Sequence, residues 1–149
     1  MLHRESEPPA KAGQAARFKS GPEIREGFFV KVQPRRVEKP WGHELIWALT
    51  DDYCGKLLFV RAGHRLSLQY HEVKDESWYV HQGRAELELG DLDGGDLDVQ
   101  EIRPGDCFHF RPGTVHRVLA LEDTTIFEVS TPQLDDVVRL ADEYGRASS

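Results

Sequence analysis

The chain has 149 residues, of which 39% are hydrophobic, and a formal net charge of −7 at pH 7. This length fits one domain, and the acidic balance argues against a generic binder of nucleic acid or anionic membranes, which depends on excess positive charge. We find no apolar stretch near the ~18 residues of a membrane span and no apolar run of a secretory signal. Cys54 and Cys107 lie far apart, which excludes a disulfide scaffold and favours two buried reduced thiols in a cytoplasmic protein.

Residues 1–26 differ from the rest of the chain because they hold few large apolar side chains and several prolines and glycines. Such a segment buries too little apolar surface to offset the entropy lost on ordering. We therefore predict a flexible N-terminal arm over residues 1–26 and a single domain over residues 27–149.

From Trp41 onward, short apolar runs alternate with turns. Between Arg84 and Leu89 apolar and charged residues alternate with a period of two, which is typical of a half-buried strand. The glycine- and aspartate-rich residues 90–96 then predict a turn. Further runs cover residues 45–49, 56–62, 65–71, 77–81, 114–121 and 125–130. About eight strands at this spacing predict an all-β sandwich or barrel.

A short helix is predicted to close the chain. Thr131 and Pro132 suit a helix N-cap and the first helical position. Gly145 stands where a C-terminal cap would lie. Between them, apolar residues recur at helical spacing: Leu134, Val137, Val138, Ala141 and Tyr144.

Four polar residues on two distant segments form a candidate metal site. Gln69 and His71 are two residues apart, so in a strand they project from one face. Glu76 opens the next strand, and His116 begins a strand far downstream. Two imidazoles, an amide oxygen and a carboxylate suit Zn²⁺, Fe²⁺, Mn²⁺, Co²⁺ or Ni²⁺ and leave positions open for substrate. The spacing alone equally allows ordinary polar strand residues and satisfied core histidines.

These segments resemble the two motifs of the cupin superfamily. Residues 63–83 are similar to G-x5-H-x-H-x3-4-E-x6-G, with Gln69 at the first histidine position. Residues 105–116 are similar to G-x5-P-x-G-x2-H-x3-N, although Arg111 replaces the proline and Ala120 replaces the asparagine. The resemblance implies a double-stranded β-helix, a jelly-roll barrel, with one divalent metal ion per chain, preferably zinc. The implied ligands are Gln69, His71, Glu76 and His116.

A narrower resemblance points to the cupin domain of type II phosphomannose isomerases. Residues 66–71, Leu-Ser-Leu-Gln-Tyr-His, are similar to one motif of that family, and residues 39–42 and 135–146 are similar to two others. The match spans about residues 37–146. It implies a homodimeric, metal-dependent isomerase of sugar phosphates that interconverts mannose 6-phosphate and fructose 6-phosphate.

The same resemblance implies roles for three basic residues. Lys74 stands where the family has an arginine associated with isomerase activity, and lysine keeps the charge but loses the bidentate fork. Lys74 and Arg146 are therefore candidate catalytic residues, and Arg139 and Arg146 are candidate ligands of the substrate phosphate. Without the resemblance, Lys74 would be a solvated turn lysine, whereas Arg139 and Arg146 would equally suit a solvated helix C-terminus that complements the helix dipole. Two other functions stay open, because a fold does not decide its chemistry: a dioxygenase acting on a small molecule, and a non-catalytic sugar-binding protein.

Overall fold

The computed structural model describes residues 30–147, so the arm predicted over residues 1–26 lies outside the described part of the chain. Residues 32–147 belong to one compact unit. Within residues 30–147 every regular element is a β-strand, which confirms the all-β prediction. In this part of the chain no helix is long and apolar enough to cross a membrane.

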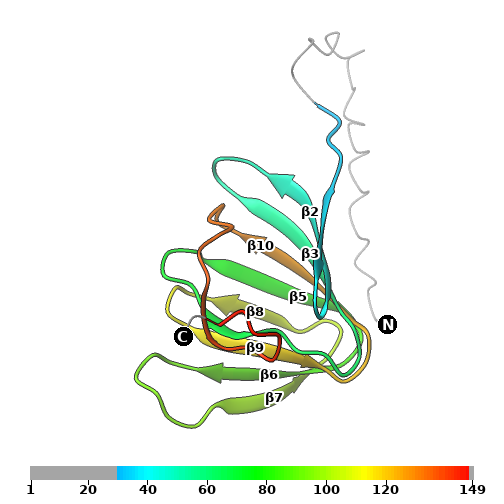
Figure 1. The fold of residues 1–149 in the computed structure, drawn as a ribbon. Helices are drawn as coiled ribbons and strands as arrows, with labels where there is room; N and C mark the ends of the chain where they lie inside the picture. The colour runs from blue at the N-terminus through cyan, green and yellow to red at the C-terminus, as the bar shows by residue number, and fades with distance from the viewer. Residues whose placement is uncertain (1–29, 148–149) are drawn as a thin grey trace, which may run out of the picture. The chain divides into compact units, whose positions relative to one another are not determined.

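The strands form two antiparallel sheets (Figure 1). In spatial order, one sheet contains β1 (Arg35–Lys39), β2 (Gly42–Leu49), β3 (Cys54–Val60), β10 (Thr124–Ser130), β5 (Glu76–Gln82) and β8 (Cys107–Phe110). The other contains β11 (Val138–Ala141), β4 (Leu68–Tyr70), β9 (Val115–Ala120), β6 (Ala85–Gly90) and β7 (Asp98–Ile102). Neighbouring strands are mostly distant in sequence, and this brings residues 71, 76 and 116 to one place.

The core is built from the inward faces of both sheets. In β5, buried and more exposed residues alternate, so every second side chain points inward. Burial of each large aliphatic side chain contributes about 1.5–3 kcal/mol. The buried cluster includes Leu58, Val60, Trp78, Val80 and Ile126 from the first sheet and Ala85, Leu87, Ile102, Val118 and Ala120 from the second.

Gly83, in the first motif, joins β5 to β6 in a turn that only glycine fits. Its φ of +85° lies in the left-handed region, and a Cβ atom there would lie 2.3 Å from the carbonyl oxygen of Asp123. Glycine is therefore required at this position both by its backbone conformation and by its close contact with the backbone of Asp123 in the same chain.

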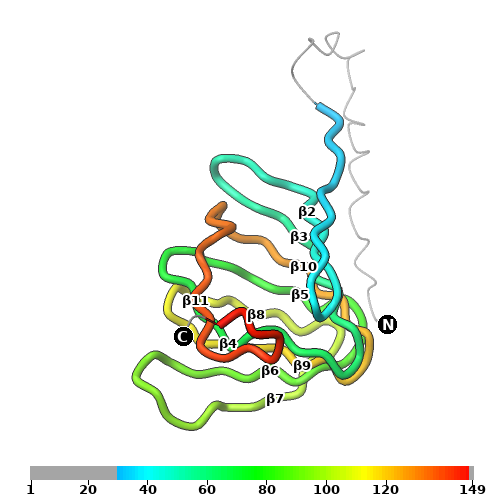
Figure 2. The backbone as a smooth tube through the Cα atoms, in the orientation of Figure 1, coloured from blue at the N-terminus to red at the C-terminus, as the bar shows by residue number. Residues whose placement is uncertain are grey.

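The predicted C-terminal helix is wrong. Residues 131–137 form turns and bends, and Val138–Ala141 forms β11, which pairs with β4 (Figure 2). The free edge of β4 supplies main-chain hydrogen-bond partners, and the β-branched pair Val137-Val138 suits an extended chain. The apolar residues at helical spacing do not form one buried stripe, because none of them is fully buried and Ala141 is exposed.

The two cysteines differ in their environment. Both are free thiols, which agrees with the absence of a disulfide scaffold. Cys54 is buried in β3 as predicted, but Cys107 is exposed at the start of β8, so the expectation of two buried thiols is wrong for Cys107. The alternation of the strand turns Cys107 outward while Phe110 points into the core.

Candidate metal centre

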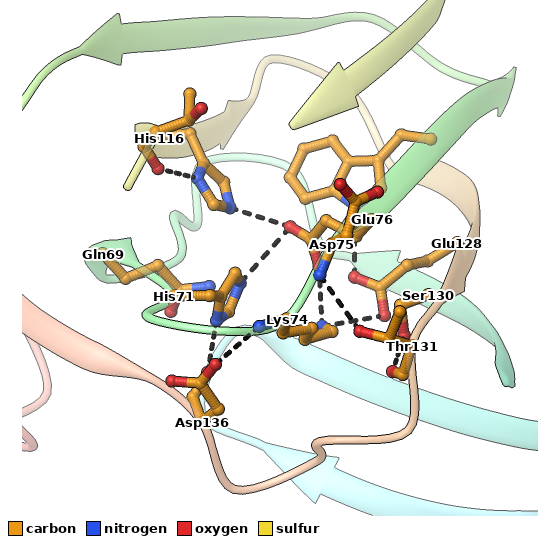
Figure 3. Close-up of polar contacts among 12 residues, drawn as sticks. Gln69, His71, Lys74, Asp75, Glu76, His116, Glu128, Ser130, Thr131 and Asp136 are labelled. Atoms are coloured by element: carbon orange, nitrogen blue, oxygen red, sulfur yellow. Dashed lines mark hydrogen bonds and ion pairs between the residues drawn. The ribbon is translucent and has the colours of Figure 1, made fainter. Parts of the chain in front are cut away.

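Three predicted ligands converge inside the barrel (Figure 3). His71 follows β4, Glu76 begins β5 and His116 lies in β9. Their ligand atoms all lie within 4.8 Å of one another. The Glu76 Oε1 atom is 3.0 Å from His116 Nε2 and 3.4 Å from His71 Nε2. All three residues are buried, with exposed fractions of 5%, 1% and 1% in chain order.

The hydrogen bonds of the two imidazoles decide which ring nitrogen faces the centre. His116 Nδ1 lies 2.9 Å from the carbonyl oxygen of Thr114, and His71 Nδ1 lies against the carbonyl oxygen of Asp136. A carbonyl oxygen only accepts, so both Nδ1 atoms carry the proton and donate. In neutral imidazoles, both Nε2 lone pairs then face the carboxylate of Glu76.

The three converging atoms lack hydrogen-bond partners. Nε2 of both histidines and Oε1 of Glu76 are fully buried, and none makes a hydrogen bond of acceptable geometry. Three buried acceptors pointing at one another repel unless a cation lies between them. Two imidazole nitrogens and a carboxylate oxygen are ligands that zinc and other divalent transition metals accept. The residues present therefore fit a divalent metal ion.

Aromatic side chains hold the His116 ring in place. Phe110 stacks on it, with ring centroids 4.7 Å apart and planes 19° from parallel. Trp78 meets it edge-on, with ring centroids 5.5 Å apart. These contacts and the Thr114 carbonyl fix the direction of the Nε2 lone pair.

Lys74 lies in the core rather than on a solvated turn. It is 4% exposed, and its Nζ donates to Glu76 Oε2 at 2.6 Å and to Glu128 Oε2 at 3.3 Å. Although burial alone would lower the pKa of Lys74, the two carboxylates outweigh it and raise that pKa above its usual value. Lys74 thus binds the Glu76 oxygen that does not face the imidazoles. The structure brings Lys74 to the centre but pairs its charge with protein carboxylates.

Glu128 is a functional candidate that the sequence analysis missed. It lies buried on β10, where Trp78 Nε1 donates to its Oε1 at 3.1 Å and Lys56 Nζ lies 3.8 Å from its Oε2. Burial and the neighbouring charge of Glu76 raise the pKa of Glu128 to about 7. Its position in the strand was the available signal. Glu128 is two residues after Ile126, so in a strand both side chains point into the core.

Asp136 ties the loop between the ligands to the chain after β10. Its Oδ1 accepts the backbone N–H of Glu72 at 3.0 Å, and its Oδ2 accepts those of Val73 and Lys74 at 2.7 Å. Partial burial opposes ionisation, but these three donors outweigh it and lower the pKa of Asp136. Since the Asp136 carbonyl also holds the His71 ring, this residue positions both His71 and Lys74.

Gln69 lies beside the three ligands, in β4. Its Cα is directly opposite that of His116 in the β4–β9 pair. Directly opposite residues of antiparallel strands share a face, so the Gln69 side chain points to the same side as His116. Its Oε1 accepts a hydrogen bond of 2.7 Å from the Ser67 hydroxyl. That Gln69 is a fourth metal ligand stays a prediction.

The two predicted phosphate ligands are placed differently. Arg139 lies in β11 directly opposite Gln69, and its Nε is buried without a hydrogen-bond partner. The guanidinium of Arg146 is paired with Asp142, at 2.7 Å and 3.0 Å, and lies over the Tyr144 ring. Arg139 thus lies in the same row across the sheet as Gln69 and His116. Arg146 instead pairs with Asp142, four residues before it.

Comparisons with known proteins agree with this architecture. A family model described as a cupin domain matches residues 57–130. Mannose-1-phosphate guanylyltransferase from Escherichia coli (strain K12) is 30% identical over 117 residues, which is 75% of this chain and 23% of that protein. The xanthan biosynthesis protein XanB from Xanthomonas campestris pv. campestris (strain B100) is 32% identical over 117 residues, 75% of this chain and 24% of that protein. The chain thus spans about a quarter of these relatives' length.

Solved structures support the fold. The structure of KdgF from Halomonas sp. superimposes with a TM-score of 0.57 and 28% sequence identity, covering 70% of this chain and 91% of that one. Oxalate decarboxylase from Bacillus subtilis superimposes with a TM-score of 0.62 at 17% identity, covering 77% of this chain and 32% of that one. The second likeness concerns the fold alone.

Proposed function

Because this chain is a member of the cupin superfamily, we propose that it is a metal-dependent sugar-phosphate isomerase, which interconverts mannose 6-phosphate and fructose 6-phosphate. The observation that carries the proposal is the convergence of three unpartnered buried atoms, from His71, Glu76 and His116. The choice of sugar rests on the resemblance of residues 37–146 to type II phosphomannose isomerases and on relatives that act in mannose-phosphate metabolism.

The centre offers a set of neutral and anionic ligands to one divalent ion, preferably zinc. His71, Glu76 and His116 would hold it, and Gln69 would join them by turning its amide oxygen from Ser67. A bound divalent metal stabilises negative charge that develops on substrate oxygens during proton transfer between neighbouring carbons.

The remaining residues of the centre keep the ligands in place. Lys74 holds Oε2 of Glu76, so Oε1 stays directed at the imidazoles. Asp136 fixes the loop that carries His71. We therefore propose Lys74 as a positioning residue, in contrast to the substrate-contacting role that the resemblance implies.

Elemental analysis of the purified protein, followed by assays of sugar phosphates after metal reconstitution, tests this function. We expect about one zinc ion per chain and turnover of mannose 6-phosphate. His116→Ala should lose both, whereas His81→Ala, which changes an exposed histidine of β5, should keep both. A zinc-loaded protein that turns over no sugar phosphate would contradict the isomerase assignment.

A second candidate function is favoured by the ligand set itself. Two histidines and one carboxylate with open positions are also the ligands of non-haem iron oxygenases. Iron in the purified protein, together with oxygen consumption on a small-molecule substrate, would support a dioxygenase instead. Homodimer formation and a cytoplasmic location stay predictions, and the former is tested by the molecular mass in solution.

A further inference from the structure

Arg139 belongs to a row of side chains that leads to the metal centre. In register, Arg139 of β11 lies opposite Gln69 of β4, which lies opposite His116 of β9. Because opposite residues of antiparallel strands share a face, the three side chains line the inner face of this sheet. His116 is fully buried, whereas Gln69 and Arg139 are half-buried. The row therefore opens toward solvent on the side of β4 and β11.

Among residues 30–147, no side chain balances the charge of the Arg139 guanidinium. Its Nε is fully buried without a hydrogen bond. Within residues 30–147 the ion-paired arginines are others, and no carboxylate lies within ion-pair distance of Arg139. An unpaired donor in a half-buried charged group is unfavourable unless something else binds it. This arginine is thus available to an anion, in contrast to Arg146, whose guanidinium is engaged by Asp142.

The surrounding charges favour an anionic ligand. Lys74 and Lys56 are balanced by Glu76 and Glu128 in the buried network. A divalent metal ion at the centre would add two positive charges, and Arg139 adds another. A partly closed site with excess positive charge attracts anions more strongly than the same charges would in water.

We propose that Arg139 is the anion-binding element of this site: its guanidinium takes the phosphate or carboxylate group of a sugar whose hydroxyl or carbonyl oxygens bind the metal. The planar fork of arginine matches both anions in a bidentate manner. Two strand spacings, about 10 Å, separate the backbones of β11 and β9. The anionic group and the metal-binding oxygens therefore belong to opposite ends of the ligand. The inference deepens the proposed function and uses its metal site.

Calorimetric binding to the zinc-loaded protein tests the proposal with mannose 6-phosphate, mannuronate and mannose as probes. Losing a charged hydrogen bond costs about 1.5–3 kcal/mol, so Arg139→Gln should weaken binding of the preferred anionic sugar roughly 10- to 100-fold. Binding of mannose and zinc should stay unchanged. Arg139→Lys, which keeps the charge but loses the fork, should give a smaller loss. The control Arg103→Gln, which changes an exposed arginine paired with Glu101, should leave the anion preference intact. The anion with the stronger Arg139 dependence identifies the group.

Three outcomes would overturn the inference. The first is equal affinity of the parent protein for mannose and both anionic sugars. The second is unchanged anion affinity in Arg139→Gln. The third is an equal loss for mannose and the anionic sugars, which would mean that Arg139 only shapes the site. Arg139-dependent binding without turnover would sink the isomerase proposal and support the anion site. Measuring the same sugar affinities of the parent protein and Arg139→Gln without metal shows whether the effect of Arg139 is independent of zinc.

Discussion

Replacing Lys74 by methionine should destabilise the domain more than any surface substitution. The methionine side chain fills most of the volume but removes the charge that separates the carboxylates of Glu76 and Glu128. Both carboxylates are buried, and each lies within 3.3 Å of Lys74 Nζ. Breaking a buried ion pair by removing one partner costs about 3–5 kcal/mol. Because Lys74 is 4% exposed, solvent does not screen this loss.

Thermal unfolding followed by circular dichroism, with a chelator present, measures this cost without a contribution from metal. For a domain of this size about 3–5 kcal/mol corresponds to a fall in Tm of roughly 12–20 °C. Metal affinity should fall as well, because Glu76 loses the donor that orients it.

A double-mutant cycle separates the charge effect from lost packing. In the Glu128→Gln background, Lys74→Met takes the lysine charge from one carboxylate rather than two, so its cost should shrink by about 1–3 kcal/mol. Trp78 Nε1 can still donate to the amide oxygen of the glutamine. If Lys74→Met lowers stability by less than about 1 kcal/mol and equally in both backgrounds, the buried network does not hold Glu76.

Asp136, Gly83 and the candidate metal site each allow a separate test. Asp136→Ala removes the acceptor of three backbone donors and should lower zinc affinity about 10- to 100-fold in a competition titration, while the exposed control Asp135→Ala should change it little. In urea unfolding, Gly83→Ala should destabilise the domain by about 1–3 kcal/mol more than Gly94→Ala. Both glycines have positive φ, but of the two only Gly83 would bring a Cβ atom against backbone atoms. Equal costs of the two substitutions would refute this clash. Free zinc at a hundredfold excess over Kd should stabilise the protein by about 2.7 kcal/mol relative to chelated protein in calorimetric scans, and superimposable scans would argue against the metal site.

The strand pattern could be predicted from the sequence because its signal is local, and the three candidate ligands could be named from their resemblance to two short motifs. Alternation between residues 84 and 89 reflects the side-chain period of a strand, and β6 lies there. The spacing of His71, Glu76 and His116 made them candidates, and the resemblance to the two cupin motifs made them the expected ligands. Turn residues and strand period both depend on residues a few positions apart, so they can be recognised in a single sequence.

The C-terminal segment and the charges around the ligands could not be predicted, because distant contacts decide them. Residues 131–145 have helical spacing, but the free edge of β4 and the donors of the 72–74 loop determine their conformation. Without the resemblance, Lys74 would be interpreted as a solvated turn lysine. Its neighbours Glu72 and Val73 are exposed, yet its own side chain turns inward to carboxylates of β5 and β10. Such pairings depend on which strands become neighbours, and no local pattern encodes that.

The hydrogen bond from His71 to the Asp136 carbonyl, which spans 65 residues of sequence, has a consequence for the kinetics of folding. The binding geometry exists only after β4 has paired with both β9 and β11, so long segments must close before any ion finds its ligands. We predict that these contacts form late, after the rate-limiting step. Metal should therefore leave the refolding rate almost unchanged and slow unfolding by nearly its whole binding contribution. In the cell, ion loading would then act chiefly on how long a folded molecule survives, and only weakly on how fast a new one matures.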